Sequence, residues 1–388
     1  MVVEIVFWVL SVLIVYVYGG YPLLLAIASA VRSRATAPEG RSATDDTLPR
    51  VTLLISAFNE AGCIAEKLDN TLGLDYPKER LEVVVISDAS DDGTDEIVSA
   101  YQPLGIRLLR MAERGGKTSG LNAGVVDSEG DVLVFSDANA MYDTQALKYL
   151  TAPFQDPSVG AVIGESSYLR PDTESGRSES LYWRYETWVK AMESRRGSVV
   201  GGDGAIYSVR RELYVPMAAH ALSDFVNPLQ VVKAGYRCVY EPRALSYEEA
   251  AADFAREFRR KVRIVNRAWR ALWSMREMLD PFRYGAFAMK LWSHKFLRWL
   301  MPVALLGVLI ANAFLIGRHP GYVLFLALQA TFYALAMVGF LFRHRARQSA
   351  VIRIPFYFCL VNVAAARGLW EAMDGKSYTT WTTARVGG

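Results

Sequence analysis

Hydrophobic positions along the chain follow two different patterns. Towards both ends, apolar residues run almost without interruption, and three runs approach or exceed the roughly 20 residues that a membrane-spanning helix needs. These runs are Ile5–Val31, Leu300–Ile316 and Gly321–Phe342. A fourth run, Ile354–Ala366, has only 13 residues before Arg367. That length predicts a re-entrant or interfacial segment, so we expect three membrane-spanning helices.

The middle of the chain, from Pro49 to about Ala250, alternates short apolar stretches with polar, helix-like stretches. The helix-like stretches include Glu60–Leu72, Asp92–Tyr101 and Lys117–Ser128, and the apolar stretches read VTLLISAF, LEVVVIS, IRLLRM, DVLVFSD and VGAVIGE. Continuous Val, Ile and Leu runs are typical of strands that are buried on both faces. The pattern therefore predicts an α/β domain with a parallel sheet covered by helices.

Polar residues follow each of these predicted strands. Ligands of such sheets bind beyond the carboxyl ends of the strands, so these residues are candidates for a site. Taken singly, each also has a plain explanation as a helix cap or a turn. Together they predict one polar cluster at one sheet edge, and they are Ser56–Glu60, Ser87–Thr94, Arg114–Lys117 and Asp137–Asn139.

Asp137 and Asn139 end the fourth predicted strand, two residues apart. In extended chain, residues i and i+2 point the same way, so both side chains can face one point. Two oxygen ligands on a short loop suit Mg²⁺ or Mn²⁺ that also binds phosphate oxygens. The complete Gly-x-x-x-x-Gly-Lys-Ser/Thr phosphate loop is lacking, because Met111 stands in place of its first glycine, and this argues against a P-loop ATPase.

Composition agrees with a membrane protein that carries a soluble insert. The 388 residues are 52% hydrophobic, with a mean hydropathy of +0.14. The net charge of +3 gives no argument for nucleic acid as a partner. The cysteines, Cys63, Cys238 and Cys359, have no paired spacing, which argues against a disulfide framework or zinc site and fits a reducing compartment.

The first apolar run has two interpretations. Small residues at Ala28–Ala30 allow a signal peptide, but Glu4 precedes the run, which is longer than the roughly 7–15 residues of a signal core. We therefore expect a retained anchor. Arginines follow the first run at positions 32 and 34 and the third at positions 343, 345 and 347. The positive-inside rule then places the middle region in the cytoplasm, on an inner (plasma) membrane of bacterial type.

Phe254–Leu279 is a basic stretch with apolar residues at helical spacing, among them Phe254, Val262 and Trp269. It predicts a helix at the membrane surface, with its apolar face in lipid and its arginines towards headgroups.

These motifs, in this order, resemble the inverting glycosyltransferases of family 2 with the GT-A fold. More narrowly, the chain resembles the membrane-integrated branch that includes cellulose, hyaluronan, chitin and poly-N-acetylglucosamine synthases. The resemblance implies a hexosyltransferase that uses a UDP-sugar and Mg²⁺ or Mn²⁺. It divides the chain into an N-terminal transmembrane helix (1–34), a GT-A domain (48–250), interfacial helices (251–298), two transmembrane helices (299–342), a basic loop with a re-entrant or interfacial segment (343–373) and a gating-loop-like tail (374–388).

The resemblance also implies roles for individual residues. Asp224, in Leu222-Ser223-Asp224-Phe225, corresponds to the catalytic base, with a helix cap as the alternative. Asp137 and Asn139 correspond to the metal-binding Asp-x-Asp motif. The implied donor-binding residues are Ala57, Glu60, Asp88, Lys117, Asp137, Arg263, Trp381 and Arg385, and the implied acceptor-binding residues are Gly204, Arg260 and Trp269.

Two positions depart from the family. Asn139 replaces a carboxylate, and the Gln-x-x-Arg-Trp signature appears as Arg260-Lys261-Val262-Arg263-Ile264, without its tryptophan. The leading expectation is synthesis of a growing polysaccharide, with translocation of the product. The alternatives are a non-processive glycolipid synthase and a non-catalytic membrane scaffold that binds nucleotide.

Overall fold

The computed structural model describes residues 1–31, 48–169, 174–249, 254–343 and 349–380. The chain divides into two compact units. The helical unit comprises Met1–Ala30, Arg170–Glu186 and Ala250–Ser377, and the sheet unit comprises Val31–Leu169, Thr187–Glu249 and Tyr378–Gly388.

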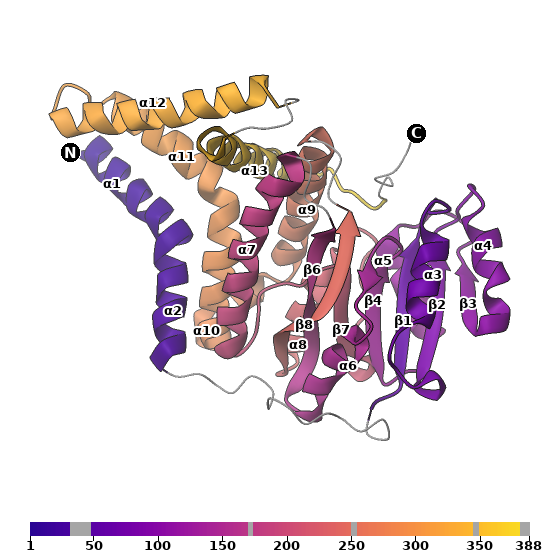
Figure 1. Cartoon of the computed structure of the whole chain (residues 1–388). Coiled ribbons are helices and arrows are strands. Elements are labelled where there is room, and N and C mark those ends of the chain that lie inside the picture. Colours follow the sequence, from indigo (N-terminus) through magenta and orange to yellow (C-terminus); the bar gives the residue numbers. More distant parts are fainter. Residues whose placement is uncertain (32–47, 170–173, 250–253, 344–348, 381–388) are drawn as a thin grey trace. The chain divides into compact units, whose positions relative to one another are not determined.

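The sheet unit is built on a mixed sheet, which has eight strands in the described residues (Figure 1). The order across the sheet is β3-β2-β1-β4-β7-β6-β8-β5. The strands are β1 (Val51–Ala57), β2 (Leu81–Ser87), β3 (Ile106–Arg110), β4 (Val132–Asp137), β5 (Met141–Tyr142), β6 (Val159–Leu169), β7 (Ile206–Arg210) and β8 (Arg237–Glu249). Strands β1 to β4 are parallel, whereas β7 is antiparallel to both β4 and β6. The predicted α/β fold is confirmed, but the sheet is mixed and not all parallel as expected. Strands β1, β2 and β4 all end at the same edge.

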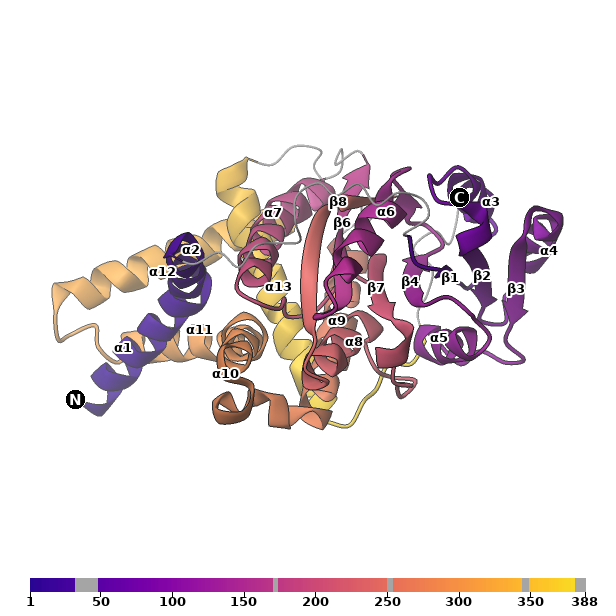
Figure 2. The ribbon, with the colours of Figure 1, turned by 90° about the horizontal axis from the view of Figure 1, so that it is seen from below.

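Helices cover both faces of this sheet (Figure 2). One face packs against α3 (Ile64–Leu72), α4 (Thr94–Ala100) and α6 (Ala146–Thr151), and the other against α5 (Lys117–Val126) and α8 (Ser223–Lys233). Along β1, Leu53 and Ile55 join the first core cluster, whereas Leu54 joins the second. Successive side chains of a strand point to opposite faces, so burial of both faces explains the unbroken apolar runs.

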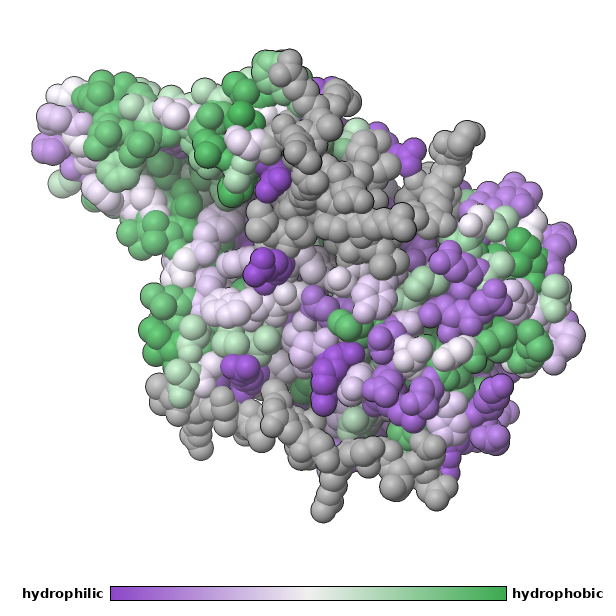
Figure 3. All heavy atoms as spheres, in the orientation of Figure 1, coloured by the Kyte–Doolittle hydropathy of each residue, from purple (hydrophilic) through white to green (hydrophobic). Residues whose placement is uncertain are grey.

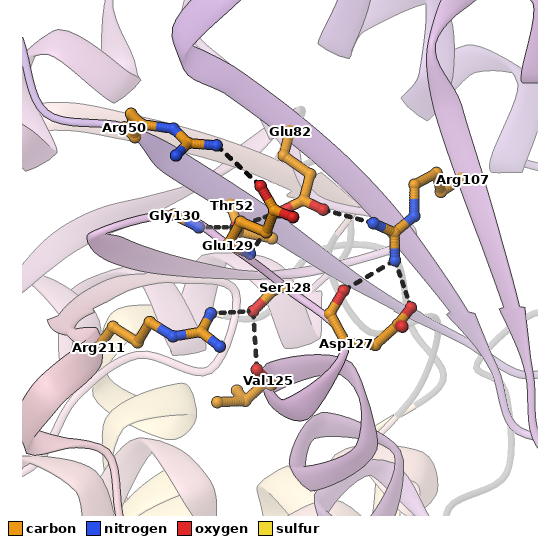
Figure 4. A network of polar contacts seen from close by, with 10 residues as sticks. All are labelled: Arg50, Thr52, Glu82, Arg107, Val125, Asp127, Ser128, Glu129, Gly130 and Arg211. Carbon is orange, nitrogen blue, oxygen red and sulfur yellow. Dashed lines mark hydrogen bonds and ion pairs between the residues drawn. The ribbon is translucent and has the colours of Figure 1, made fainter.

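A polar network holds the opposite edge, where the parallel strands begin (Figure 4). Thr52 of β1 donates to Glu82 of β2 at 2.6 Å and accepts from the backbone N–H of Gly130 at 2.9 Å. Arg107 of β3 pairs with Glu82 at 2.6 Å, and Arg211 donates to Ser128 at 2.8 Å. The polar side chains of this edge bond to one another. The carboxyl ends of the strands, at the other edge, are therefore the candidate place for a ligand.

The helical unit contains, among the described residues, four helical segments that are long and apolar enough to cross a membrane. They are Val2–Ala30, Pro281–Ala313, Pro320–Leu341 and Ala350–Met373. The helices are α1 (Val2–Val15), α2 (Tyr21–Val31), α9 (Phe254–Ser274), α10 (Pro281–Leu291), α11 (Leu297–Ala313), α12 (Pro320–Leu341) and α13 (Ala350–Met373), with π-helical segments at Tyr16–Gly20 and Trp292–Phe296. The first part of α7 (Glu174–Arg195) also belongs to this unit, and its residues from Thr187 belong to the sheet unit.

Much of the surface of α1 and α12 is apolar, and Figure 3 shows green side chains gathered over both helices. Val9 and Val12 of α1 are exposed, as are Leu324 and Leu328 of α12. Exposed aliphatic side chains in such numbers are costly in water and ordinary in lipid, so the unit associates with a membrane.

The last helix differs from the sequence-based expectation. In place of a segment of 13 residues, α13 is one continuous helix of 24 residues. Arg367, which ends the apolar run, lies inside this helix and pairs with Glu371 one turn later at 3.1 Å. The length of α13 thus allows a crossing, although the prediction of an interfacial segment stays open.

The basic helix α9 packs along α13. The rings of Phe254 and Phe356 meet at 4.8 Å, and a Cβ at Gly368 would lie 2.6 Å from the carbonyl oxygen of Val262. The expectation that Phe254 and Val262 face lipid is therefore wrong, since α13 covers them. An apolar helix face is buried equally well by another helix of the same chain.

Candidate active site

The loops that follow β1 and β2 are joined by hydrogen bonds. The Asn59 backbone N–H donates to Ser90 Oγ at 3.1 Å, and its side chain exchanges bonds of 2.7 and 3.0 Å with Asp91. The Glu60 N–H donates to Thr94 Oγ1 at 2.9 Å. Asn59 and Ala89 adopt positive φ angles of 54° and 59°, which costs on the order of 1–3 kcal/mol each. The contacts between the loops hold this strained backbone in place.

Asp88 holds the next loop. Its carboxylate accepts from the N–H of Gly115 at 2.8 Å and from the N–H of Gly116 at 2.9 and 3.0 Å. The side chain is only 2% exposed. Hydrogen bonds to a charged acceptor are the strong ones, each contributing about 1.5–3 kcal/mol. Asp88 thus fixes the start of α5, and its donor-binding role remains a prediction.

Three charged groups converge around Gly204. Lys117, the first residue of α5, forms an ion pair with Asp137 at the end of β4, and its Nζ donates to the Gly204 carbonyl oxygen at 3.1 Å. A Cβ placed on Gly204 would lie 3.5 Å from Lys117 Nζ and 3.6 Å from an Asp224 carboxylate oxygen. The structure therefore brings together Lys117, Asp137, Gly204 and Asp224, which the sequence separates by as many as 107 residues.

Asp224 lies in the first turn of α8 and is partly exposed. The N-cap of α8 is Leu222, without a side-chain cap, so Asp224 does not fill the alternative role of a helix cap. A helix N-terminus stabilises a carboxylate. The N–H of Gly202 donates to the Asp224 carbonyl oxygen at 2.6 Å, and a Cβ at Gly202 would lie 2.7 Å from that oxygen. The glycines at 202 and 204 thus let this loop approach Asp224 closely.

The oxygens of Asp137 and Asn139 fit a divalent cation that is shared with a ligand. Carboxylate and amide oxygens are hard donors, which Mg²⁺ and Mn²⁺ prefer, and such ions complete their coordination with phosphate oxygens and water. The described residues contain no cluster of three or more His, Cys, Asp or Glu side chains that would hold a metal ion unaided. The donor set therefore fits a cation that arrives with a diphosphate.

Two other predicted donor-binding residues follow β1. The Ala57 side chain is fully buried in the core, so only its main chain is near the loops, where its carbonyl oxygen accepts from Asp88 N–H at 2.9 Å. Ala57 can therefore contact a donor only through its main chain, and its predicted donor-binding role stays a prediction. Glu60 is partly exposed, and its carboxylate accepts from Cys63 Sγ at 3.2 Å.

The start of the predicted gating tail lies against the glycine loop. Tyr378–Thr380 belong to the sheet unit, and a Cβ at Gly116 would collide with the carbonyl oxygen of Thr379. Gly116 has a φ of +88°, which favours glycine, and the close approach of Thr379 leaves no room for a side chain at this position. Trp381 and Arg385 lie outside the described residues, so their predicted contacts with nucleotide remain predictions.

Arg260, Arg263 and Trp269 belong to the helical unit, on α9. Arg260 pairs with the buried Glu257 at 2.8 Å. Trp269 stacks against Trp273 at 6.1 Å and Phe296 at 5.5 Å, inside an aromatic cluster. Trp269 therefore does not present the open ring that stacking on an acceptor sugar needs. The role of Arg263 stays a prediction.

Sequence reasoning missed two buried polar residues of the sheet unit. Lys67 of α3 is fully buried, and its Nζ donates to the carbonyl oxygen of Ala140, beside Asn139. Burial lowers the pKa of the Lys67 ammonium, and the nearby carboxylates of Asp137 and Glu248 offset part of this shift. The resulting pKa is about 7. A lysine on the apolar stripe that includes Ile64 and Leu68 was the available signal.

Asp203 is the second missed residue. It is 8% exposed, and its Oδ1 accepts from the Ala205 N–H at 3.2 Å. Its Oδ2 has no hydrogen-bond partner in the described part of the chain. The signal in the sequence was a carboxylate inside the stretch Gly201-Gly202-Asp203-Gly204.

Comparison with known proteins finds similarity over part of the chain. Residues 52–214 match the model of the family described as Glycosyl transferase family 2. The chain is 27% identical over 234 residues to the probable glycosyltransferase YdaM of Bacillus subtilis (strain 168), covering 56% of this chain and 54% of that protein. It is 26% identical over 209 residues to the poly-beta-1,6-N-acetyl-D-glucosamine synthase of Staphylococcus aureus (strain MSSA476), covering 52% and 50%. The chain thus spans about half the length of these curated relatives.

A solved structure resembles nearly the whole chain. It is the mannosyltransferase PcManGT from Pyrobaculum calidifontis, in complex with GDP-Man and Mn²⁺. The TM-score is 0.70, the identity is 24%, and the match covers 96% of this chain and 99% of that chain. At this identity the likeness shows a shared fold.

Proposed function

We propose that the protein, whose residues 52–214 match the model of Glycosyl transferase family 2 and whose fold is of the GT-A type, transfers a hexose, with inversion, from a nucleotide diphosphate sugar to a hydroxyl group at the membrane. The observation that carries this proposal is the convergence of Lys117, Asp137 and Asp224 around Gly204. One cation and two carboxylates at the carboxyl ends of the strands match the needs of a sugar transfer with a diphosphate leaving group.

Asp224 is the proposed base. Its carboxylate takes the proton of the acceptor hydroxyl while that oxygen forms a bond to the anomeric carbon from the face opposite the diphosphate. The bond between the anomeric carbon and the diphosphate oxygen breaks, and the leaving group carries away its electron pair. The partly exposed position of Asp224 in the first turn of α8 lets an acceptor reach it.

Lys117 is the proposed cation for the leaving diphosphate. Its ammonium lies between the Asp137 carboxylate and the Gly204 carbonyl oxygen, so it is held by two acceptors while remaining partly exposed. A positive charge that is already in position stabilises developing negative charge at little reorganisation cost. Asp137 and Asn139 would hold Mg²⁺ or Mn²⁺, and a bound cation would supply further charge neutralisation on the diphosphate.

A UDP-sugar is the proposed donor, and a growing polysaccharide is the proposed acceptor. Support comes from the similarity, over 209 residues, to poly-beta-1,6-N-acetyl-D-glucosamine synthases. The apolar helices of the helical unit fit an acceptor that is met at the membrane, and charge asymmetry supports a cytoplasmic sheet unit on an inner (plasma) membrane. Translocation of the product is a further part of this proposal.

Transfer to a lipid hydroxyl, without chain extension, is the second candidate. The packing of Trp269 against Trp273 and Phe296 favours it, because an open aromatic platform for a sugar chain is then lacking at this position of α9.

A donor screen with the purified full-length protein tests the proposal. UDP-glucose, UDP-N-acetylglucosamine, UDP-galactose, UDP-glucuronate and GDP-mannose would each be incubated with membrane lipid extract, with Mg²⁺ and Mn²⁺ compared. A ladder of products on a sizing gel supports polysaccharide synthesis, and a single lipid-soluble product supports the second candidate. Absence of transfer from every donor, by a protein that binds nucleotide, would contradict the proposal and favour a non-catalytic scaffold.

A further inference from the structure

One face of α3 holds the loop that carries Asp137 and Asn139. Cys63, at the N-cap of α3, lies with its Sγ 3.8 Å from the Ala138 carbonyl oxygen, and Lys67 donates to the Ala140 carbonyl oxygen. One turn further along α3, the Asn70 side chain donates to the Tyr142 carbonyl oxygen and accepts from the Tyr142 N–H, both at 2.8 Å. Positions 63, 67 and 70 share one helix face, so this face of α3 contacts every second residue of the loop, at positions 138, 140 and 142.

The contacts with α3 determine which residues of the loop are buried and which are exposed. Ala138, Ala140 and Tyr142 are buried, at 2%, 0% and 3% exposure, whereas Asp137 and Asn139 between them are partly exposed. Asp137 ends β4, and residues 138 and 139 form a turn in which the Ala140 N–H donates to the Asp137 carbonyl oxygen at 3.2 Å, so the extended chain expected there from the sequence is not observed. Holding the buried residues against α3 leaves the Asp137 and Asn139 side chains on the exposed side of this turn.

Lys67 is the unusual member of this face. It is fully buried and lies 4.1 Å from the ring centre of Tyr142. A buried amine is costly unless it makes hydrogen bonds, and an apolar side chain of similar length would fill the same space at lower cost. The gain that a methionine lacks is donation to the Ala140 carbonyl oxygen, which the ammonium and the neutral amine can both make.

We propose that Lys67 is a positioning residue for the donor diphosphate and its divalent cation, and that it acts by holding the Ala140 carbonyl oxygen so that Asp137 and Asn139 present their oxygens to one point. The inference rests on the proposed function of this loop. Residues that orient metal ligands typically change metal affinity or activity 10–100-fold when they are replaced.

The test compares Lys67→Met with the full-length wild type in detergent micelles. The Mn²⁺ affinity in the presence of UDP is measured by electron paramagnetic resonance, and the UDP affinity by calorimetry. We expect both affinities to fall about 10–100-fold in Lys67→Met. The melting temperature is expected to change little, because loss of one hydrogen bond is offset by removal of a buried amine. Lys148→Met, at an exposed ion pair with Asp75, is the matched control and keeps wild-type affinities.

Wild-type affinities in a folded Lys67→Met protein would overturn the inference and leave the proposed function standing. A wild type that binds no nucleotide would instead overturn the proposed function, and the inference with it. If Lys67→Met does not fold, Lys67→Gln is measured in its place. Its shorter side chain keeps a donor but reaches the Ala140 carbonyl oxygen less well, so Mn²⁺ binding should weaken several-fold, and unchanged binding is the contrary result.

Discussion

Replacing Gly116 with alanine perturbs the loop above Asp88 in two ways that can be measured separately. The backbone at Gly116 has a φ of +88°, which costs a residue with a Cβ on the order of 1–3 kcal/mol. The added methyl group would also collide with the carbonyl oxygen of Thr379 in the tail. Overpacking of this kind costs about 1–3 kcal/mol more. Only the second cost depends on the tail.

A double-mutant cycle isolates the collision. Gly116→Ala would be made in the full-length chain and in a chain that ends at Ser377, and UDP affinity would be measured by calorimetry for all four proteins. We expect a coupling of about 1–3 kcal/mol, which corresponds to roughly a 5- to 150-fold difference in affinity. Gly105→Ala is a control for positive φ alone, because Gly105 has a φ of +90° and open space around its Cβ position.

Additive effects of the two changes, with a coupling below about 0.5 kcal/mol, would refute this reasoning. The tail would then not lie on Gly116 in the working protein. A loss of UDP affinity in Gly105→Ala as large as that in Gly116→Ala would also contradict it, since a change far from the loop should not act on the nucleotide.

Four further predictions follow from the same contacts. Asp224→Asn should lower kcat by about 10²–10⁴-fold and leave UDP affinity within twofold; unchanged turnover would mean that Asp224 is not the base. Asn139→Asp should raise Mn²⁺ affinity about tenfold in a resonance titration, because it adds a charged ligand, and an unchanged affinity would mean that position 139 does not face the cation. Burial would raise the pKa of Glu257, but Lys261 and Arg260 outweigh it and bring this pKa down to about 2. Glu257 therefore stabilises the folded protein at pH values above its ordinary pKa of 4.5, and this contribution is lost as the pH falls towards 2. The difference in melting temperature between wild type and Glu257→Gln should shrink below pH 4.5, and a constant difference would exclude this pairing. Finally, contact of Thr379 with Gly116 implies that Ser377 is on the same membrane side as the sheet, so Ser377→Cys should react with an impermeant maleimide only from that side; reaction from the other side would show that α13 crosses.

The sequence by itself determined the α/β class, the positions of the first four strands along the chain and the edge at which polar residues gather. These features depend on periodicity and on the ends of strands, which are local properties of the chain. It also predicted that Asp137 and Asp224 belong to one site, but only through a family resemblance. Nothing in residues near Asp137 indicates a partner 87 positions away.

The tertiary structure decided which neighbour each polar group meets. Asp88 binds the amides of Gly115 and Gly116, and the Ala57 side chain turns into the core. Lys67 donates to Ala140 across 73 residues, and a helix rather than lipid covers Phe254. Such contacts are formed between segments that are distant in the chain. Local periodicity predicts that a side chain is buried, whereas only packing in three dimensions determines which residues or lipids cover it.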